Sequence, residues 1–164
     1  MPYTSKIIAN YFLDLAREAR TSLTPMKIQK LVYYAHGLNL ALNDCPLIVD
    51  PVEAWKYGPV IPTLYHSFKQ YGAGPITEKA LSWISDGTSV VAHEPKVPID
   101  DYLTKTIMDA VWDNYGGLTG IQLSNMTHEP GSPWDQVWKT VRDKNSADIS
   151  DEIIKRYFCN LLNA

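Results

Sequence analysis

The side chains best suited to acid–base or metal chemistry in this chain are its four histidines. They are His36, His66, His93 and His128. A zinc site of the HExxH type needs two imidazoles one helical turn apart, and none of these histidines has a partner at such a spacing. We expect His36 to be a capped or surface-facing helix residue. His128 lies beside Glu129 and close to Trp134, which is typical of a fixed hydrogen-bonding post.

Patterns for nucleophilic catalysis and phosphate binding are also missing from the sequence. Cys45 has no histidine close by, and the chain has no GxSxG elbow. The glycine-rich run 72–75 ends in Pro75, which lacks the N–H donor that a phosphate-binding loop needs. Cys45 and Cys159 have no CxxC spacing and are expected to be unpaired thiols. The sequence therefore indicates no catalytic site, no metal site and no cofactor.

Aromatic residues indicate binding more strongly than any residue indicates catalysis. Trp55, Tyr57 and Tyr65 surround a bend at Gly58-Pro59, and Tyr33 and Tyr34 are adjacent within a helical pattern. Because neighbours on a helix point in different directions, we do not expect both tyrosines to enter one core. Tyrosine and tryptophan combine a large, stiff contact area with a polar tip, as interface anchors do. Tyr34, Trp55 and Tyr57 are therefore candidate partner-binding residues, unless these rings only wedge the bend against the helices.

Helix signals explain how these residues would be positioned. Thr24 followed by Pro25 is a cap and first-turn pair, and it begins a predicted helix that runs to about Leu42. Four prolines, the last of them Pro62, follow Cys45 within the stretch 46–62 and predict extended or turning backbone there. The other predicted helices begin at Thr4 or Ser5, between Pro59 and Pro62, at Asp100 or Asp101, at Thr119 in a capping box with Gln122, at Ser132, and at Ser150.

The segment 81–97 is the only good strand candidate. Asp86-Gly87 separates residues 82–85 from 88–91, and this dipeptide favours a two-residue hairpin turn. A lone hairpin is marginally stable in water, so we expect it to lean on the helices. The sequence predicts a mainly α (α+β) fold, a compact helical bundle with a small β-hairpin, in a single domain spanning residues 1–164.

Composition limits the class of partner. The chain has 164 residues and a formal net charge of −3, with acidic and basic residues interspersed. A nucleic-acid partner would call for clustered Lys and Arg, so nucleic acid is not an expected partner. No apolar run reaches the roughly 18–20 residues that span a bilayer, and the first residues lack the layout of a signal peptide. We therefore expect a cytoplasmic protein with no membrane partner.

Three blocks of sequence resemble the Panacea domain, the SocA-type antitoxin family of bacterial, prophage and phage toxin–antitoxin operons. The blocks read MKIQKLVYYA at 26–35, EAWKYGPV at 53–60, and LSNMTHE at 123–129 leading to Pro133-Trp134. The third block departs from a compact form, because Gly131-Ser132 is inserted before Pro133-Trp134. The resemblance implies an antitoxin that contacts a toxin encoded beside it. It also implies a family that pairs with many unrelated toxins, and it assigns no catalytic residue.

Four functional hypotheses remain open from the sequence. The leading one is an antitoxin that neutralises a cognate toxin from a neighbouring gene by direct protein–protein binding. An adaptor that delivers its partner to a protease is the second, and an enzyme of unrecognised type using His128 or His36 is the third. DNA-binding autoregulation is the least favoured, because the sequence has no basic recognition helix.

Overall fold

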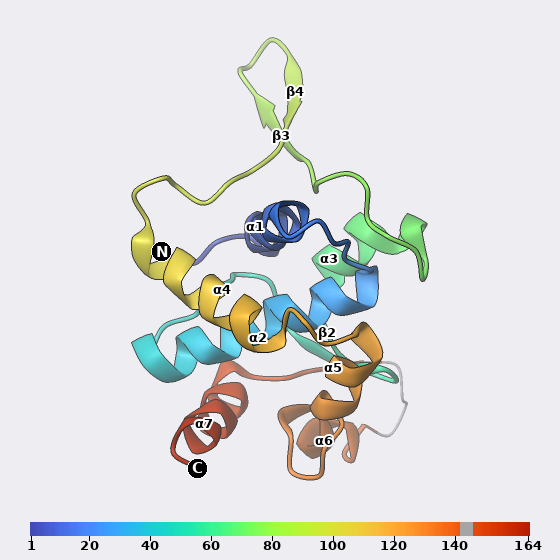
Figure 1. The fold of residues 1–164 in the computed structure, drawn as a ribbon, viewed down its shortest axis with the longest axis vertical. Helices are drawn as coiled ribbons and strands as arrows, with labels where there is room; N and C mark the ends of the chain where they lie inside the picture. Colours follow the sequence, from blue (N-terminus) through green and yellow to red (C-terminus); the bar gives the residue numbers. More distant parts are fainter. Residues whose placement is uncertain (142–145) are drawn as a thin grey trace.

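The computed structural model describes residues 1–141 and 146–164. Helices dominate, and the long helix α2 lies at their centre, in contact with α1, α3, α4, α5 and α7 (Figure 1). The elements in chain order are α1 (Ser5–Glu18), α2 (Pro25–Asn43), β1 (Glu53–Trp55), β2 (Gly58–Val60), α3 (Pro62–Phe68), the 3-10 turn η1 (Lys69–Tyr71), β3 (Ser82–Ser85), β4 (Val90–His93), α4 (Tyr102–Tyr115), α5 (Gly120–Thr127), α6 (Pro133–Trp138), β5 (Ala147–Asp148) and α7 (Asp151–Leu162). The predicted mainly α (α+β) class is confirmed.

Most helices begin at the predicted caps, because side-chain oxygens there accept the free N–H groups of the first turn. The Thr24 hydroxyl accepts from the third residue of α2 at 3.2 Å, and the Asp101 carboxylate accepts from α4 at 3.0 Å. Thr119 and Gln122 form both halves of the predicted capping box at α5. None of the described helices is long and apolar enough to cross a membrane.

The central position of α2 places both of its adjacent tyrosines in the core. Tyr33 meets Phe158 of α7 edge-on, with ring centroids 5.8 Å apart, and Tyr34 stacks on Tyr115 of α4 at 4.5 Å. The prediction that both rings could not enter one core is wrong, because the core surrounds α2 and different helices cover its different sides. Tyr34 is 4% exposed and presents no accessible ring.

His36 is also buried in α2, so the expectation of a capped or surface-facing histidine is wrong. Its Nδ1 accepts the Leu47 N–H at 3.3 Å, which leaves the proton on Nε2, 2.9 Å from Asp151 Oδ1. The imidazole thereby joins α2 to the first turn of α7 and to the chain that follows α2. Both ring nitrogens have partners inside the fold.

A small sheet with strand order β2-β1-β5 lies beside α2, and the sequence did not predict it. β1 and β2 are antiparallel, with Glu53 opposite Val60 and Trp55 opposite Gly58, and β5 pairs with the other edge of β1. The prediction that strands occur only within 81–97 is therefore wrong. Each of these strands is at most three residues long, too short to show an alternating pattern.

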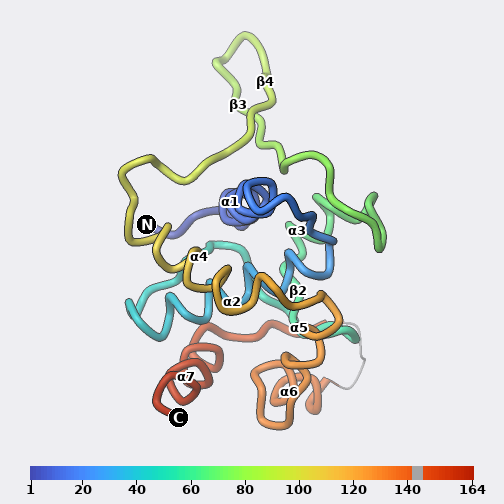
Figure 2. The backbone as a smooth tube through the Cα atoms, in the orientation of Figure 1, coloured from blue at the N-terminus to red at the C-terminus, as the bar shows by residue number. Residues whose placement is uncertain are grey.

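The predicted hairpin is present as β3–β4, and it projects from the body of the molecule beyond α1 (Figure 2). Its loop has four residues instead of two, because the Asp86 carboxylate accepts the N–H groups of Thr88 and Ser89 at 2.8 and 2.7 Å. The second strand consequently starts at Val90 instead of Thr88. The hairpin is fixed to helix α1 only at its base, through Asn10, and the large apolar side chains of its strands are more than half exposed, so the expectation that it leans on the helices holds for the base alone.

Candidate partner-binding site

The first two sequence blocks meet in space where the N-terminal half of α2 lies against hairpin β1–β2 and helix α3. Together they form a pocket that is open to solvent and has a volume of about 180 Å³. Its lining is almost entirely apolar and includes Pro25, Met26, Trp55, Val60, Leu64 and Tyr65. The pocket depends on how hairpin β1–β2 is held against α2, which two consecutive residues of α2 explain.

Gln29 fixes the end of the hairpin through both atoms of its side-chain amide. Nε2 donates to the Ile61 carbonyl at 3.0 Å, and Oε1 accepts the Ile61 N–H at 2.9 Å. The buried amide thus pairs with a single residue of the backbone as a neighbouring strand would. It sets the point at which β2 gives way to α3.

Lys30 fixes the tip of the same hairpin from inside the protein. Its Nζ donates to the carbonyls of Tyr57 at 3.3 Å and Pro59 at 3.1 Å, and the side chain is 2% exposed. Burial lowers the pKa of Lys30 to about 7. Gly58, between the two carbonyls, has a φ of +112°, and a Cβ there would lie 2.6 Å from the Lys30 Nζ. A side chain at Gly58 would therefore be strained by the positive φ and would require the Lys30 Nζ to shift.

Trp55 and Tyr65 form one wall of the pocket. Their rings meet edge-on with centroids 4.9 Å apart. The Trp55 indole N–H donates to Glu53 Oε2 at 2.6 Å, and its backbone carbonyl accepts the Trp134 indole N–H at 2.6 Å. The Trp55 ring is therefore held by Tyr65 and Glu53, and its backbone is held by Trp134.

Tyr57 stands at the rim of the pocket and is 67% exposed. The Lys56 ammonium lies 5.5 Å from the centroid of its ring. Of the three predicted partner-binding residues, the structure brings Trp55 and Tyr57 together at this pocket and places Tyr34 in the core.

Sequence reasoning missed the contribution of Met26 and Lys30 to this site. Met26 is 40% exposed in the first turn of α2, where a flexible apolar side chain facing solvent is a usable signal for a binding surface. Lys30 carries no such signal. Its burial follows from the hairpin that covers it, which the helical pattern of α2 does not reveal.

The remaining histidines have structural contacts. His128 Nδ1 lies 2.5 Å from the Ser124 carbonyl, and its ring packs against Trp134 with centroids 4.2 Å apart, which confirms the fixed hydrogen-bonding post. His93 Nδ1 lies 3.0 Å from the Ser82 carbonyl. Over residues 1–141 and 146–164, no three His, Cys, Asp or Glu side chains are placed to hold a metal ion. Cys45 and Cys159 are free thiols, as expected.

Comparison with known proteins gives two matches. The family model described as "Antitoxin SocA-like, Panacea domain" matches residues 28–135, which include both hairpins and the pocket residues other than Pro25 and Met26. Antitoxin SocA of Caulobacter vibrioides (strain NA1000 / CB15N) is 31% identical over 134 residues, which cover 81% of this chain and 69% of that protein. No solved structure matches the chain.

Proposed function

Because the chain belongs to the SocA-like Panacea-domain antitoxin family, we propose that it neutralises a toxin encoded by a neighbouring gene. Neutralisation is by direct protein–protein contact in the cytoplasm, and the apolar pocket at Trp55 and Tyr57 lies at the centre of the contact surface. The observation that carries this proposal is that two family-like sequence blocks, distant along the chain, converge on one accessible apolar pocket.

The size of the pocket favours a protein partner over a small molecule. At about 180 Å³ it is smaller than the roughly 300–1,000 Å³ of typical small-molecule sites. It suits a single apolar side chain of a partner, inserted between Met26 and the Trp55–Tyr65 wall. A nanomolar complex corresponds to about −12 kcal/mol, and typical interfaces bury about 800 Å² on each partner, so the contact must extend beyond the pocket.

Co-expression with the adjacent reading frame tests the proposal, with Tyr57→Ala as the key variant. The neighbouring gene should be lethal alone and harmless with the wild-type chain. Loss of an exposed aromatic anchor of about 2 kcal/mol should weaken binding about 30-fold. Tyr102→Ala is the matched control, because Tyr102 is 74% exposed and has a lysine Nζ 6.0 Å from its ring centroid, but lies at the start of α4. This control should bind like the wild type.

Three results would contradict the proposal. The neighbouring gene product is harmless alone, it stays lethal in the presence of this chain, or Tyr57→Ala and Tyr102→Ala bind it equally well. The adaptor alternative has its own readout, since the half-life of the partner would then fall while the bound partner stayed active. An enzyme acting through His128 or His36 would lose more function in the alanine variants than their loss of stability explains, because both rings make contacts inside the fold.

A further inference from the structure

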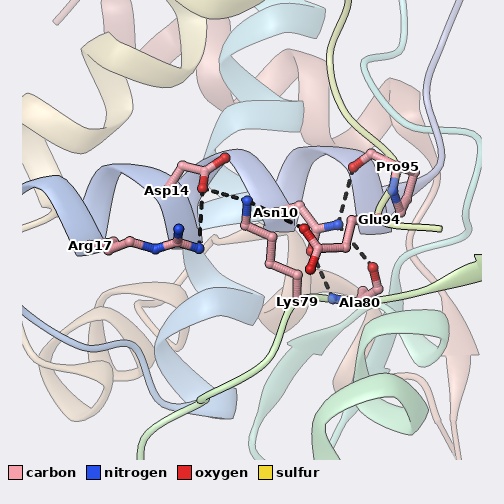
Figure 3. A network of polar contacts seen from close by, with 7 residues as sticks. All are labelled: Asn10, Asp14, Arg17, Lys79, Ala80, Glu94 and Pro95. Atoms are coloured by element: carbon pink, nitrogen blue, oxygen red, sulfur yellow. Dashed lines mark hydrogen bonds and ion pairs between the residues drawn. The ribbon is translucent and has the colours of Figure 1, made fainter.

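The projecting hairpin β3–β4 is anchored at its base by one buried amide. Asn10 of α1 is 1% exposed, and its Nδ2 donates to the Ala80 carbonyl at 3.0 Å and to the Pro95 carbonyl at 3.1 Å. Its Oδ1 accepts the Ala80 N–H at 2.8 Å. Ala80 precedes the hairpin and Pro95 follows it, so a single side chain holds both ends of the hairpin stem on α1 (Figure 3).

Charged side chains strengthen the same stem. Lys79 Nζ lies 2.5 Å from Asp14 Oδ1 on α1 and 3.8 Å from Glu94 Oε2 at the end of the hairpin (Figure 3). Lys6 Nζ donates to the Leu81 carbonyl at 2.9 Å. The stem is therefore fixed to the body of the molecule from several directions, while the strands extend beyond it.

Both faces of the hairpin expose apolar side chains. Because side chains alternate between faces along a strand, the observed register puts Trp83 and Val90 on one face and the opposed pair Ile84 and Val91 on the other. The exposed fractions are 68% and 64% on the first face, and 55% and 59% on the second. A hairpin that covered a core would keep one polar face. This hairpin leaves two apolar faces in water.

The loop at the tip is stiff and acidic. Asp86 accepts hydrogen bonds from the N–H and hydroxyl groups of both Thr88 and Ser89. These bonds hold the pKa of the exposed Asp86 carboxyl well below its usual range, so the tip carries a negative charge at neutral pH. No Lys or Arg occurs in the sequence between Lys79 and Lys96, which disfavours nucleic acid as the ligand of the hairpin.

We propose that the hairpin 82–93 is a preformed arm that inserts into a cleft of the cognate toxin. The two walls of that cleft are apolar and each contacts one face of the arm, and a Lys or Arg of the toxin faces Asp86. A second copy of this chain fits less well. A two-fold contact between hairpins would cover one face of each copy and leave the other face in water. A cleft covers both faces, and the anchored stem lowers the ordering cost of insertion.

The arm can share a partner with the pocket at Trp55 and Tyr57. Helix α3 lies between the two, and the Tyr65 and His66 rings on it are 5.3 Å apart. Tyr65 lines the first pocket, and His66 lines a second, open pocket whose wall includes Trp83 of the hairpin. A toxin seated over Trp55 therefore reaches the hairpin across α3. The proposal of an inserted arm rests on the proposed function, and it adds a second contact with the toxin.

Two double variants test insertion, one on each face. Trp83→Thr with Val90→Thr, and Ile84→Thr with Val91→Thr, remove the apolar groups while keeping strand-forming residues. The matched control is Tyr102→Thr with Leu103→Thr, an exposed apolar pair at the start of α4. Each chain is titrated with the purified product of the neighbouring reading frame. Either face variant should weaken binding at least 30-fold, and the control less than threefold.

Hydrogen–deuterium exchange supplies the second measurement. Amides of 82–93 should gain protection in the wild-type complex, and their exchange in the free variants should match the free wild type, which shows that the hairpin still forms. Asp86→Asn keeps an acceptor oxygen for the loop and should weaken binding and reduce its dependence on salt concentration.

Several results would overturn the proposal that the hairpin is an inserted arm. Sensitivity of one face alone would show a flat contact instead of a cleft. A wild-type dimer in solution that both face variants convert to a monomer would show a second copy as the occupant. Equal binding by all variants would end the inference and leave the proposed function standing, whereas a wild-type chain that does not bind the neighbouring protein would end both.

Discussion

Hairpins β1–β2 and β3–β4 are held by the same kind of contact but end in opposite surroundings. In each, one buried side-chain amide from a helix binds backbone atoms, Gln29 for the first hairpin and Asn10 for the second. The strands of the first hairpin cover the buried Lys30, and β1 also pairs with β5. The strands of the second hairpin extend into solvent. A buried side-chain amide thus fixes the position of each hairpin. Whether the hairpin also stabilises the fold depends on whether its strands cover buried side chains.

The glycines of the two hairpins give the sharpest test of this contrast. In Gly58→Ala, the strain of a Cβ at positive φ lowers the free energy of unfolding by about 1–2 kcal/mol. The Cβ also displaces the Lys30 Nζ from two backbone carbonyls, and each carbonyl left unpaired costs about a further 1–3 kcal/mol. The lower ends of these ranges add to about 3 kcal/mol, so we expect the free energy of unfolding in urea to fall by at least about 3 kcal/mol. In Gly87→Ala, φ is also positive at +89°, but a Cβ would meet no described atom within 4 Å. The expected loss there is about 1 kcal/mol. Equal losses would show that Lys30 gives way easily.

Removing the two amides should have the next largest effects. Gln29→Ala leaves the N–H and carbonyl of buried Ile61 unpaired, which should lower the global free energy of unfolding by about 2–3 kcal/mol. Asn10→Ala frees the stem of a hairpin that can open locally, so the global loss should be smaller. Amides of 82–93 should instead exchange faster. An equal global loss in urea denaturation would contradict the contrast between the hairpins.

The buried amine under the first hairpin should make stability depend on pH. The pKa of Lys30 falls to about 7 in the fold from 10.5. Between these values the unfolded chain binds more protons, so the free energy of unfolding rises with pH, by at most about 1.4 kcal/mol per pH unit. Tyr3 and Tyr11, whose pKa values burial raises to about 12, act in the opposite direction only above about pH 10. In Lys30→Met, the free energy of unfolding should rise less between pH 7 and 9 than in the wild type. An unchanged slope would show that other groups cause the pH dependence.

The sequence predicted what depends on neighbours along the chain. Caps such as Thr24, and the capping box at Thr119, act over three residues and can be read directly. The sheet β2-β1-β5 could not be predicted, because β5 pairs with β1 from far along the chain. The hairpin at Asp86 was predicted, but its register was not, since the carboxylate of that residue captures Thr88 and Ser89.

The candidate site was predicted in part for the same reason. Trp55 ends β1 and Tyr57 stands in the turn that follows, where exposed aromatic residues are informative. Tyr34 was misplaced because α4 and α7, which cover it, are distant in sequence. Lys30 could not be found, because a lysine on a helix is normally solvated, and its burial depends on a hairpin nearly thirty residues on.

The anchor of the second hairpin has a consequence for how this protein can change. Asn10 binds only main-chain atoms of Ala80 and Pro95, so the mounting does not depend on the side chains carried between them. Codons 82–93 can accumulate substitutions without disturbing the residues that make the core. With the hairpin as the proposed arm, partner choice and foldability are encoded in separate parts of the gene, and a new hairpin grafted between the same two fixed points should redirect the protein to a different target.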